Sequence, residues 1–203
     1  HINTRPGDEY ADERRDFALT TGVDRTPGGR LWAAWFAGGD SDLGFLLAAT
    51  SDDAGLTWSK PRLAIDPTDS PTGLRRRALV GNLWTDPTGR LWLFYDQSLG
   101  YFDGRAGVWA ITCDNPDAAE PAWSAPRRIW HGATLNKPTV LRTGEWLFPA
   151  ALWAPSGWLP ADNPAFAHCA DLDSERFSNV YVTRDQGESF ALLGRAEVAE
   201  RVF

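Results

Sequence analysis

Two aspartates, Asp40 and Asp42, stand one residue apart in the segment "FAGGDSD". A carboxyl group whose pKa is raised by burial can act as a general acid and protonate a leaving oxygen. These two residues are therefore the candidate catalytic acids. The structural alternative is a solvated turn, because Gly, Asp and Ser are residues that turns favour.

Basic side chains occur at comparable places along the chain. Arg77 closes the run "RRR", and Lys137 follows Asn136 in "LNKP". An arginine binds a carboxylate through two parallel hydrogen bonds, which suits an acidic sugar such as a uronate or a sialate. Lys137 has two interpretations, as a substrate contact or as the partner of a neighbouring acid. The candidate substrate-binding residues are Arg15, Arg77, Asp96, Asp103, Arg105, Asn136, Lys137 and His168. In the simpler alternative, Asp103 and Arg105 form an ion pair and His168 is structural.

The composition excludes several classes of protein. A length of 203 residues suits one domain or part of a larger one, and the net charge of -7 argues against nucleic acid or membranes as partners. No run approaches the roughly 18 apolar residues of a membrane span, and no metal cluster or nucleotide-binding glycine motif is present. Cys113 and Cys169 permit at most one disulfide, and we expect two unpaired thiols.

A repeated phrase gives the architecture that positions these residues. The segments "GGRLWAAWF", "TGRLWLFYD" and "TGEWLFPAA" each combine a glycine turn with a tryptophan-containing strand. One strand precedes each turn and two follow it. Four strands per repeat, three times over, predict an all-β chain with the four-stranded antiparallel blades of a β-propeller. The expected blades cover residues 16–66, 77–131 and 135–199.

Three blades do not close a propeller, which typically needs four to eight. The chain begins at His1 and contains no methionine, so we expect it to be a segment of a longer protein. Residues 1–203 are then the N-terminal half of a propeller that further blades, or a partner chain, complete. No signal peptide is visible, and the localisation stays open, with secretion or the periplasm favoured for a glycan-active enzyme.

A second repeated motif predicts a structural turn. It consists of a hydroxyl residue, an acid two positions later, a glycine and an aromatic residue. The two intact copies are Ser51, Asp53, Gly55 and Trp58, and Thr183, Asp185, Gly187 and Phe190. The hydroxyl and the carboxylate can accept hydrogen bonds from the turn amides, glycine supplies the left-handed position, and the aromatic ring packs into the blade. A damaged copy with an insertion begins at Thr112 and ends at Trp123.

This motif resembles the Asp box, or BNR repeat, of the sialidase (neuraminidase) superfamily. The segments "DGRAGVWAIT" and "LNKPTVL" are similar to bacterial sialidase-like, BNR-repeat glycosidases. The resemblance implies a six-bladed propeller and, in most members, removal of a terminal sugar by hydrolysis. It also implies that Asp40 and Asp42 follow the strand after which the sialidase acid/base aspartate lies.

Strand order predicts which end of the blades carries a site. The starts of the inner strands and the loops between second and third strands share one end, and the Asp boxes lie at the other. The sialidase pattern places an arginine inside the first inner strand, whereas "FALTTG" has none there and Arg15 lies just upstream. The resemblance implies that the nucleophilic tyrosine, its glutamate partner and the remaining arginines come from later blades.

Three functions compete at this stage. The first is a sialidase-like exo-glycosidase that acts on a terminal, acidic sugar of an oligosaccharide or glycoconjugate, without a cofactor. The second is a non-catalytic glycan-binding propeller that uses its eleven tryptophans as stacking platforms. The third is a polysaccharide lyase, a class also found on propellers.

Overall fold

Apolar residues alternate along the strands, so the two faces of a strand differ in burial. In β3 (Leu31–Ala37), Trp32, Ala34 and Phe36 are buried on one face of the strand, and the residues between them are less buried. Successive side chains of a strand point to opposite faces of its sheet, so this pattern gives each blade two faces that can pack on neighbouring blades. The computed structural model describes residues 2–15, 17–41, 43–67, 76–99, 107–152 and 170–196.

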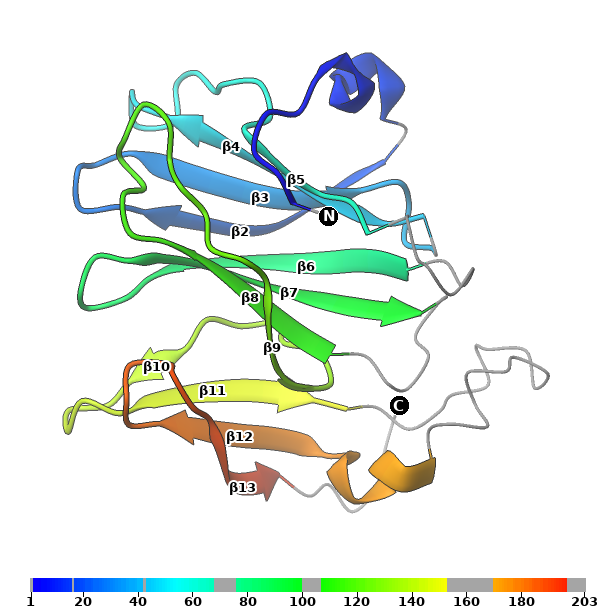
Figure 1. The fold of residues 1–203 in the computed structure, drawn as a ribbon, viewed down its shortest axis with the longest axis vertical. Coiled ribbons are helices and arrows are strands. Elements are labelled where there is room, and N and C mark those ends of the chain that lie inside the picture. The colour runs from blue at the N-terminus through cyan, green and yellow to red at the C-terminus, as the bar shows by residue number, and fades with distance from the viewer. Residues whose placement is uncertain are drawn as a thin grey trace.

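Within these residues the strands form three antiparallel sheets that stack as propeller blades (Figure 1). The first blade contains β2 (Ala18–Arg25), β3, β4 (Phe45–Ser51) and β5 (Leu63–Ile65). The second contains β6 (Arg76–Thr85), β7 (Leu91–Leu99), β8 (Gly107–Cys113) and β9 (Arg127–His131). The third contains β10 (Thr139–Val140), β11 (Trp146–Ala151), β12 (Ser178–Thr183) and β13 (Ala191–Ala196). The predicted all-β propeller fold is confirmed.

The amino-terminal segment adds elements that the sequence did not predict. The short strand β1 (Ile2–Asn3) pairs with β5 and becomes a fifth strand at the outer edge of the first blade. Two 3-10 turns follow, η1 (Asp8–Tyr10) and η2 (Asp12–Arg14), and a third, η4 (Ala170–Glu175), precedes β12. A two-residue strand carries no readable alternation, which is why the repeat pattern did not reveal β1.

The blades are joined by two aromatic-rich cores. Between the first and second blades, Trp32 and Phe36 pack with Leu93 and Tyr95. Between the second and third blades, Trp92, Phe94, Trp146 and Phe148 form the centre of the contact, with Trp92 and Phe94 stacked at 5.4 Å between ring centroids. Burial of one such side chain contributes about 1.5–3 kcal/mol, so these contacts hold the blades in a fixed order.

An arginine from each of the first two blades reaches the third-to-fourth turn of the following blade. In the first blade, Arg62 donates from Nη2 to the carbonyl oxygen of Ala119. In the second, Arg127 donates from Nη1 to the carbonyl of Glu188 at 2.8 Å and from Nη2 to the carbonyl of Gly187. Both arginines stand four residues after the aromatic marker of their blade, in "WSKPR" and "WSAPR". The repeat therefore encodes a blade-to-blade hydrogen bond as well as a strand.

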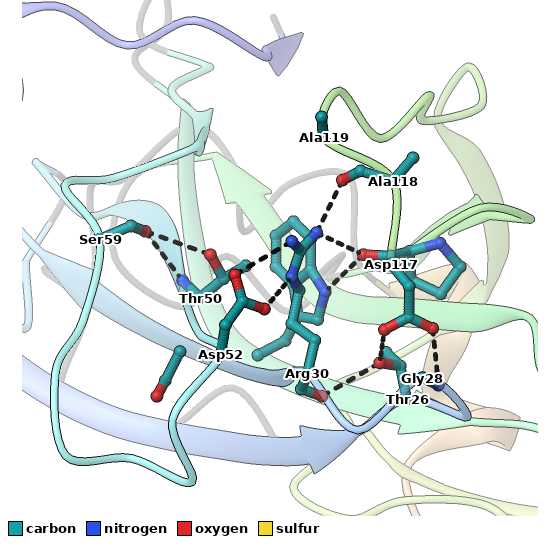
Figure 2. A network of polar contacts seen from close by, with 12 residues as sticks. Thr26, Gly28, Arg30, Thr50, Asp52, Ser59, Asp117, Ala118 and Ala119 are labelled. Carbon is teal, nitrogen blue, oxygen red and sulfur yellow. Dashed lines mark hydrogen bonds and ion pairs between the residues drawn. The ribbon is translucent and has the colours of Figure 1, made fainter.

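The insertion in the damaged Asp box forms a second link between the first two blades (Figure 2). The carboxylate of Asp117 accepts hydrogen bonds from the Thr26 hydroxyl and, at 2.9 Å, from the backbone N–H of Gly28. Arg30 forms a two-pronged ion pair with Asp52, at 2.7 and 3.1 Å, and donates from Nη1 to the carbonyl of Ala118 at 2.7 Å. The inserted residues thus lie against the first-to-second-strand turn of the first blade.

Candidate functional site

The two ends of the stacked blades differ as strand order predicted. In Figure 1 the turns that join first to second strands and the Asp-box turns lie on the left. The loop from β3 to β4 and the start of β6 lie on the right. The right-hand end is therefore where the inner strands of the first two blades begin, and where Asp40 and Arg77 are located.

The loop that carries Asp40 is a tight glycine turn. Gly38 and Gly39 have φ of +82° and +88°, and a Cβ atom on Gly38 would lie 2.4 Å from the carbonyl oxygen of Leu43. Ser41 closes the turn, since its hydroxyl donates to the Gly38 carbonyl at 3.2 Å and accepts from the Leu43 N–H at 3.1 Å. The Asp40 side chain is 52% exposed at the tip. The sequence thus presents the Asp40 carboxylate to solvent from a hydrogen-bonded glycine turn.

Arg77 lies directly beneath this loop. Its side chain is 1% exposed. Its Nε donates to the hydroxyl of Ser98 at 3.0 Å, and its Nη1 donates to the carbonyl of Ser41 at 3.1 Å. The same Nη1 lies 3.8 Å from Oδ1 of Asp40. The structure therefore brings the two predicted residues Asp40 and Arg77 together.

Asp96 is the buried acid of this end. Its side chain is 6% exposed, its Oδ1 accepts from the N–H of Thr134 at 3.0 Å, and its Oδ2 has no hydrogen-bond partner. Burial raises the pKa of Asp96 well above its ordinary value, while the Thr134 N–H and the charge of Arg77 oppose that rise. Asn82 donates to the carbonyl of Thr134 at 2.8 Å. Together Asp96 and Asn82 hold the peptide at the start of the third blade's inner segment.

Two other predicted binding residues point elsewhere. Lys137 donates from Nζ to the carbonyl of Val23 at 2.8 Å and to Oδ1 of Asp24 at 3.0 Å, so it pairs with an acid of the first blade. Asn136 is exposed, and its carbonyl accepts from the Thr134 hydroxyl at 3.0 Å. The ammonium group of Lys137 thus contacts the inner strand of the first blade near that blade's first turn, away from the Asp40 loop.

Arg15 covers the front face of the first blade, defined here as the face of β3 that carries Ala33 and Trp35. Its guanidinium lies 5.2 Å above the Trp35 ring and forms an ion pair with Asp12. Burial lowers the pKa of Arg15 from its usual value. A cavity of about 910 Å³ lies on this face, lined by Arg15, Trp35 and Trp58 among others. Since Asp40 is not among its lining residues, this cavity belongs to an open sheet face and not to the candidate site.

Four predicted site residues lie outside the residues that the structure describes. They are Asp42, Asp103, Arg105 and His168, and Cys169 lies outside them too. Cys113 is a buried free thiol whose Sγ lies 3.3 Å from Oδ1 of Asn115. Burial raises the pKa of the Cys113 thiol.

The Asp boxes stand at the opposite end and are closed turns. In the first, the Ser51 hydroxyl accepts from the Gly55 N–H at 2.8 Å and donates to Asp53 at 2.7 Å, and Asp53 accepts from both the N–H and the hydroxyl of Thr57. The second copy repeats these bonds with Thr183, Asp185 and Ser189. The hydrogen bonds lower the pKa of Asp53 and of Asp185 to about 2.

Two details of these turns differ from expectation. Glycine was expected to supply the single left-handed position, but Ala54 and Gln186 also have positive φ, 60° and 57°. Trp58 was expected to pack into its blade, yet it is 43% exposed because it lies beside the open front face. Phe190 does pack inward, with its ring 5.6 Å from that of Phe148.

Sequence reasoning missed the residues that anchor the candidate site. Ser98 stands opposite Arg77 in the β6–β7 register, and Ser41 bridges Arg77 to the loop. Strand alternation alone places Asp96 and Ser98 on one face of β7, which was a usable signal for Ser98. Nothing in the sequence signalled the bond to Ser41, because it depends on a backbone carbonyl of another blade.

Metal-binding clusters and membrane-spanning helices are both absent from the described residues. No group of three or more His, Cys, Asp or Glu side chains there could hold a metal ion. No helix in the same part of the chain is long and apolar enough to cross a membrane.

Comparisons with solved structures support the fold. A Hadza microbial sialidase superposes with a TM-score of 0.65 at 15% identity, covering 93% of this chain and 39% of its own. A Dyadobacter fermentans protein of unknown function superposes with a TM-score of 0.62 at 11% identity, and the match covers 90% of this chain and 56% of that protein. Trypanosoma rangeli sialidase, solved with sialic acid, superposes with a TM-score of 0.56 at 12% identity, and the match covers 86% of this chain and 30% of that sialidase. The chain thus spans 30–56% of the length of these structures.

A comparison with curated protein sequences finds no match. The family comparison is positive, because the BNR repeat-like domain matches residues 29–191, from the first glycine turn to the start of β13. That span includes both intact Asp boxes, the Asp40 loop and Arg77. The chain therefore belongs to the family of BNR repeat-like domains, with a fold of the sialidase-like superfamily.

Proposed function

We propose that this chain forms the N-terminal blades of a sialidase-like glycoside hydrolase that removes a terminal sugar from a glycan. The observation that carries the proposal is the exposed Asp40 carboxylate, which lies at the tip of a glycine turn and 3.8 Å from the guanidinium of the buried Arg77. A carboxyl group at the end of the blades where inner strands begin can meet a leaving oxygen, and the burial that a general acid requires would come from the substrate and from further blades.

Asp40 has the role of general acid in this proposal. It donates a proton to the glycosidic oxygen as the bond to the terminal sugar breaks, so that the leaving group departs as an alcohol. The substrate class that we would test first is a terminal acidic sugar. The BNR repeats of the chain and the sialidases among the similar structures support this choice.

The nucleophile is not supplied by the buried tyrosines of this chain. Tyr95 and Tyr181 are 2% and 0% exposed, and burial raises the pKa of both hydroxyl groups. A buried, neutral phenol cannot reach a sugar carbon or supply a phenolate. We therefore place the nucleophile in further blades. Sialidase structures more than twice the length of this chain, of which it covers 39% and 30%, support this placement.

Hydrolysis by the full-length protein tests the role of Asp40. Asp40→Asn should lower kcat by about 10²–10⁴, the usual contribution of general acid catalysis. The loss should be larger on a natural disaccharide, whose leaving group needs a proton, than on an aryl glycoside with a good leaving group. The matched control is Asp114→Asn, which alters an exposed acid paired with Arg90 at the Asp-box end.

Equal activity of the Asp40→Asn and Asp114→Asn proteins would remove Asp40 from the mechanism. Wild-type protein that binds glycans of a broad panel but hydrolyses none would instead identify a glycan-binding propeller. Release of a product with the ultraviolet absorbance of an unsaturated uronate would identify a lyase.

A further inference from the structure

Arg77 was predicted to grip a substrate carboxylate, but its burial excludes that contact in this structure. The side chain is 1% exposed, although the propeller is open on two sides. Additional blades can only reduce this exposure. A guanidinium that binds an acidic sugar must present N–H groups to the space the sugar occupies. The group therefore needs another explanation.

The hydrogen bonds of Arg77 join two blades. The Nε–H bond to the Ser98 hydroxyl fixes the guanidinium against β7 of its own blade, where Ser98 is the direct cross-strand partner of Arg77. The Nη1–H bond to the Ser41 carbonyl crosses to the first blade. One side chain thus connects the second blade to the loop that carries Asp40.

A backbone hydrogen bond is a second contact between β6 and the loop that carries Asp40. The N–H of Ala78, the next residue of β6, donates to the carbonyl of Gly44 at 2.9 Å. The loop from Gly38 to Gly44 is therefore tied to β6 near its tip and at its end. Because Asp40 precedes Ser41 directly, the position of its carboxylate depends on the Arg77 bond.

Charge gives the same arrangement a second effect. The cationic guanidinium lies 3.8 Å from Oδ1 of Asp40, within ion-pair distance. A buried guanidinium tends to keep its acceptors, because moving it would leave a buried charge without hydrogen bonds. The position of the Asp40 carboxylate is consequently coupled to that of Arg77.

We infer that Arg77 is a positioning residue, which acts on the reaction by fixing the Ser41 carbonyl and the Asp40 carboxylate and not by contacting substrate. This inference rests on the proposed role of Asp40. In this role Arg77 does not bind the substrate. It links the second blade to the loop of the first blade that carries Asp40.

Steady-state kinetics of the full-length protein separate the two roles. Arg77→Ala should lower kcat by about 10–100-fold, because a misplacement of about 1 Å can cost about 10²-fold. Its KM for an acidic sugar should change by less than about 3-fold. A residue that binds the sugar carboxylate would instead raise KM by roughly 10-fold or more, the usual cost of losing a hydrogen bond to a charged group.

Three further variants sharpen the test. Arg77→Lys keeps the charge and one donor, and should recover part of the lost kcat. Ser98→Ala removes only the acceptor of Nε and should lower kcat a few-fold at unchanged KM, which keeps the inference testable if Arg77→Ala does not fold. Arg76→Ala changes the neighbouring arginine, whose side chain points to the other face of β6, and should match wild type.

Chemical rescue gives a readout that a purely structural role would not move. Added guanidinium, at millimolar concentration, should restore part of the kcat of Arg77→Ala and none of that of Asp40→Asn. A rise in KM at unchanged kcat, or wild-type kinetics for Arg77→Ala and Ser98→Ala, overturns the inference while leaving Asp40 in place. Wild-type turnover of Asp40→Asn overturns the proposed function itself.

Discussion

The carboxylates of Asp53 and Asp185 show how a residue can be acidic without taking part in chemistry. Each accepts hydrogen bonds from an N–H and a hydroxyl two or four residues away, and each has its pKa lowered to about 2. A carboxylate so stabilised is a poor proton donor at neutral pH. An aspartate therefore stabilises a turn at one end of the blades, and at the other end an aspartate, Asp40, is the candidate acid.

These shifts predict a defined acid sensitivity. The pKa of each aspartate is lower in the folded state than its ordinary value of 3.8, so the charged form favours folding. Their stabilisation should be complete above about pH 4 and should disappear as the pH falls towards about 2. The double variant Asp53→Asn, Asp185→Asn should therefore unfold at lower urea than wild type near pH 7. The two urea midpoints should converge near pH 2, and a constant gap across that range would contradict the assignment.

Sequence reasoning succeeded for residues whose role is local. The Asp-box bonds follow from spacing within one turn, and the Asp40 loop from its two glycines. It could not establish the role of Arg77, because an arginine run looks the same whether its members bind solvent, substrate or a neighbouring loop. Burial to 1% exposure is a property of three-dimensional packing.

At the scale of elements, the phrase that ends in arginine connects neighbouring blades. Arg62 and Arg127 occupy the same position of the repeat, and both donate to backbone carbonyls of the following blade's third-to-fourth turn. In the second blade, the Arg127 guanidinium also lies 5.9 Å from the centroid of the Trp92 ring. The contact combines charge-assisted hydrogen bonds with a cation–π contact at the interface of two sheets.

Removal of this contact should loosen the third blade. Arg127→Ala should lower the free energy of unfolding by about 1–3 kcal/mol, since it leaves two carbonyls without a charged donor. Arg128→Ala is the matched control, because Arg128 is exposed and lies 3.0 Å from His131 on its own strand. Urea unfolding followed by tryptophan fluorescence measures both. Equal effects of the two substitutions would show that the carbonyl contacts contribute nothing.

The order of the strands could be predicted from the sequence, whereas the contacts between blades could not. Glycine turns and tryptophan strands predicted the three sheets, because each repeat carries its own alternation. The link from Asp117 to Thr26 and Gly28 was hidden, since it joins residues about ninety positions apart through an insertion that breaks the repeat. Such contacts depend on how blades stack and leave no periodic trace.

At the scale of the whole molecule, one ion pair spans the first and third blades. Lys137 bonds Asp24, whose other carboxylate oxygen accepts from the N–H of Thr85 in the second blade. Asp24 therefore connects all three described blades along their inner strands. The interaction is partly exposed, with Lys137 at 38% and Asp24 at 22%, so solvent weakens it.

This geometry favours a stabilising role for Lys137. A double-mutant cycle of Asp24→Ala and Lys137→Ala should give a coupling energy of about 0.5–1 kcal/mol in unfolding free energy. The KM of Lys137→Ala for an acidic sugar should stay within about 3-fold of wild type, a smaller change than loss of a charged substrate contact would cause. A coupling energy of zero together with a raised KM would instead indicate that Lys137 binds the substrate.

The arginine contact also gives the row of blades a direction. Its donor stands on one side of a blade and its acceptor carbonyls on the other, so the two sides of a blade are unlike. In the third blade, the position four residues after Phe190 is Gly194, where the earlier blades have Arg62 and Arg127. A blade that follows the third would therefore pack against it without the arginine contact that joins the first blade to the second and the second to the third.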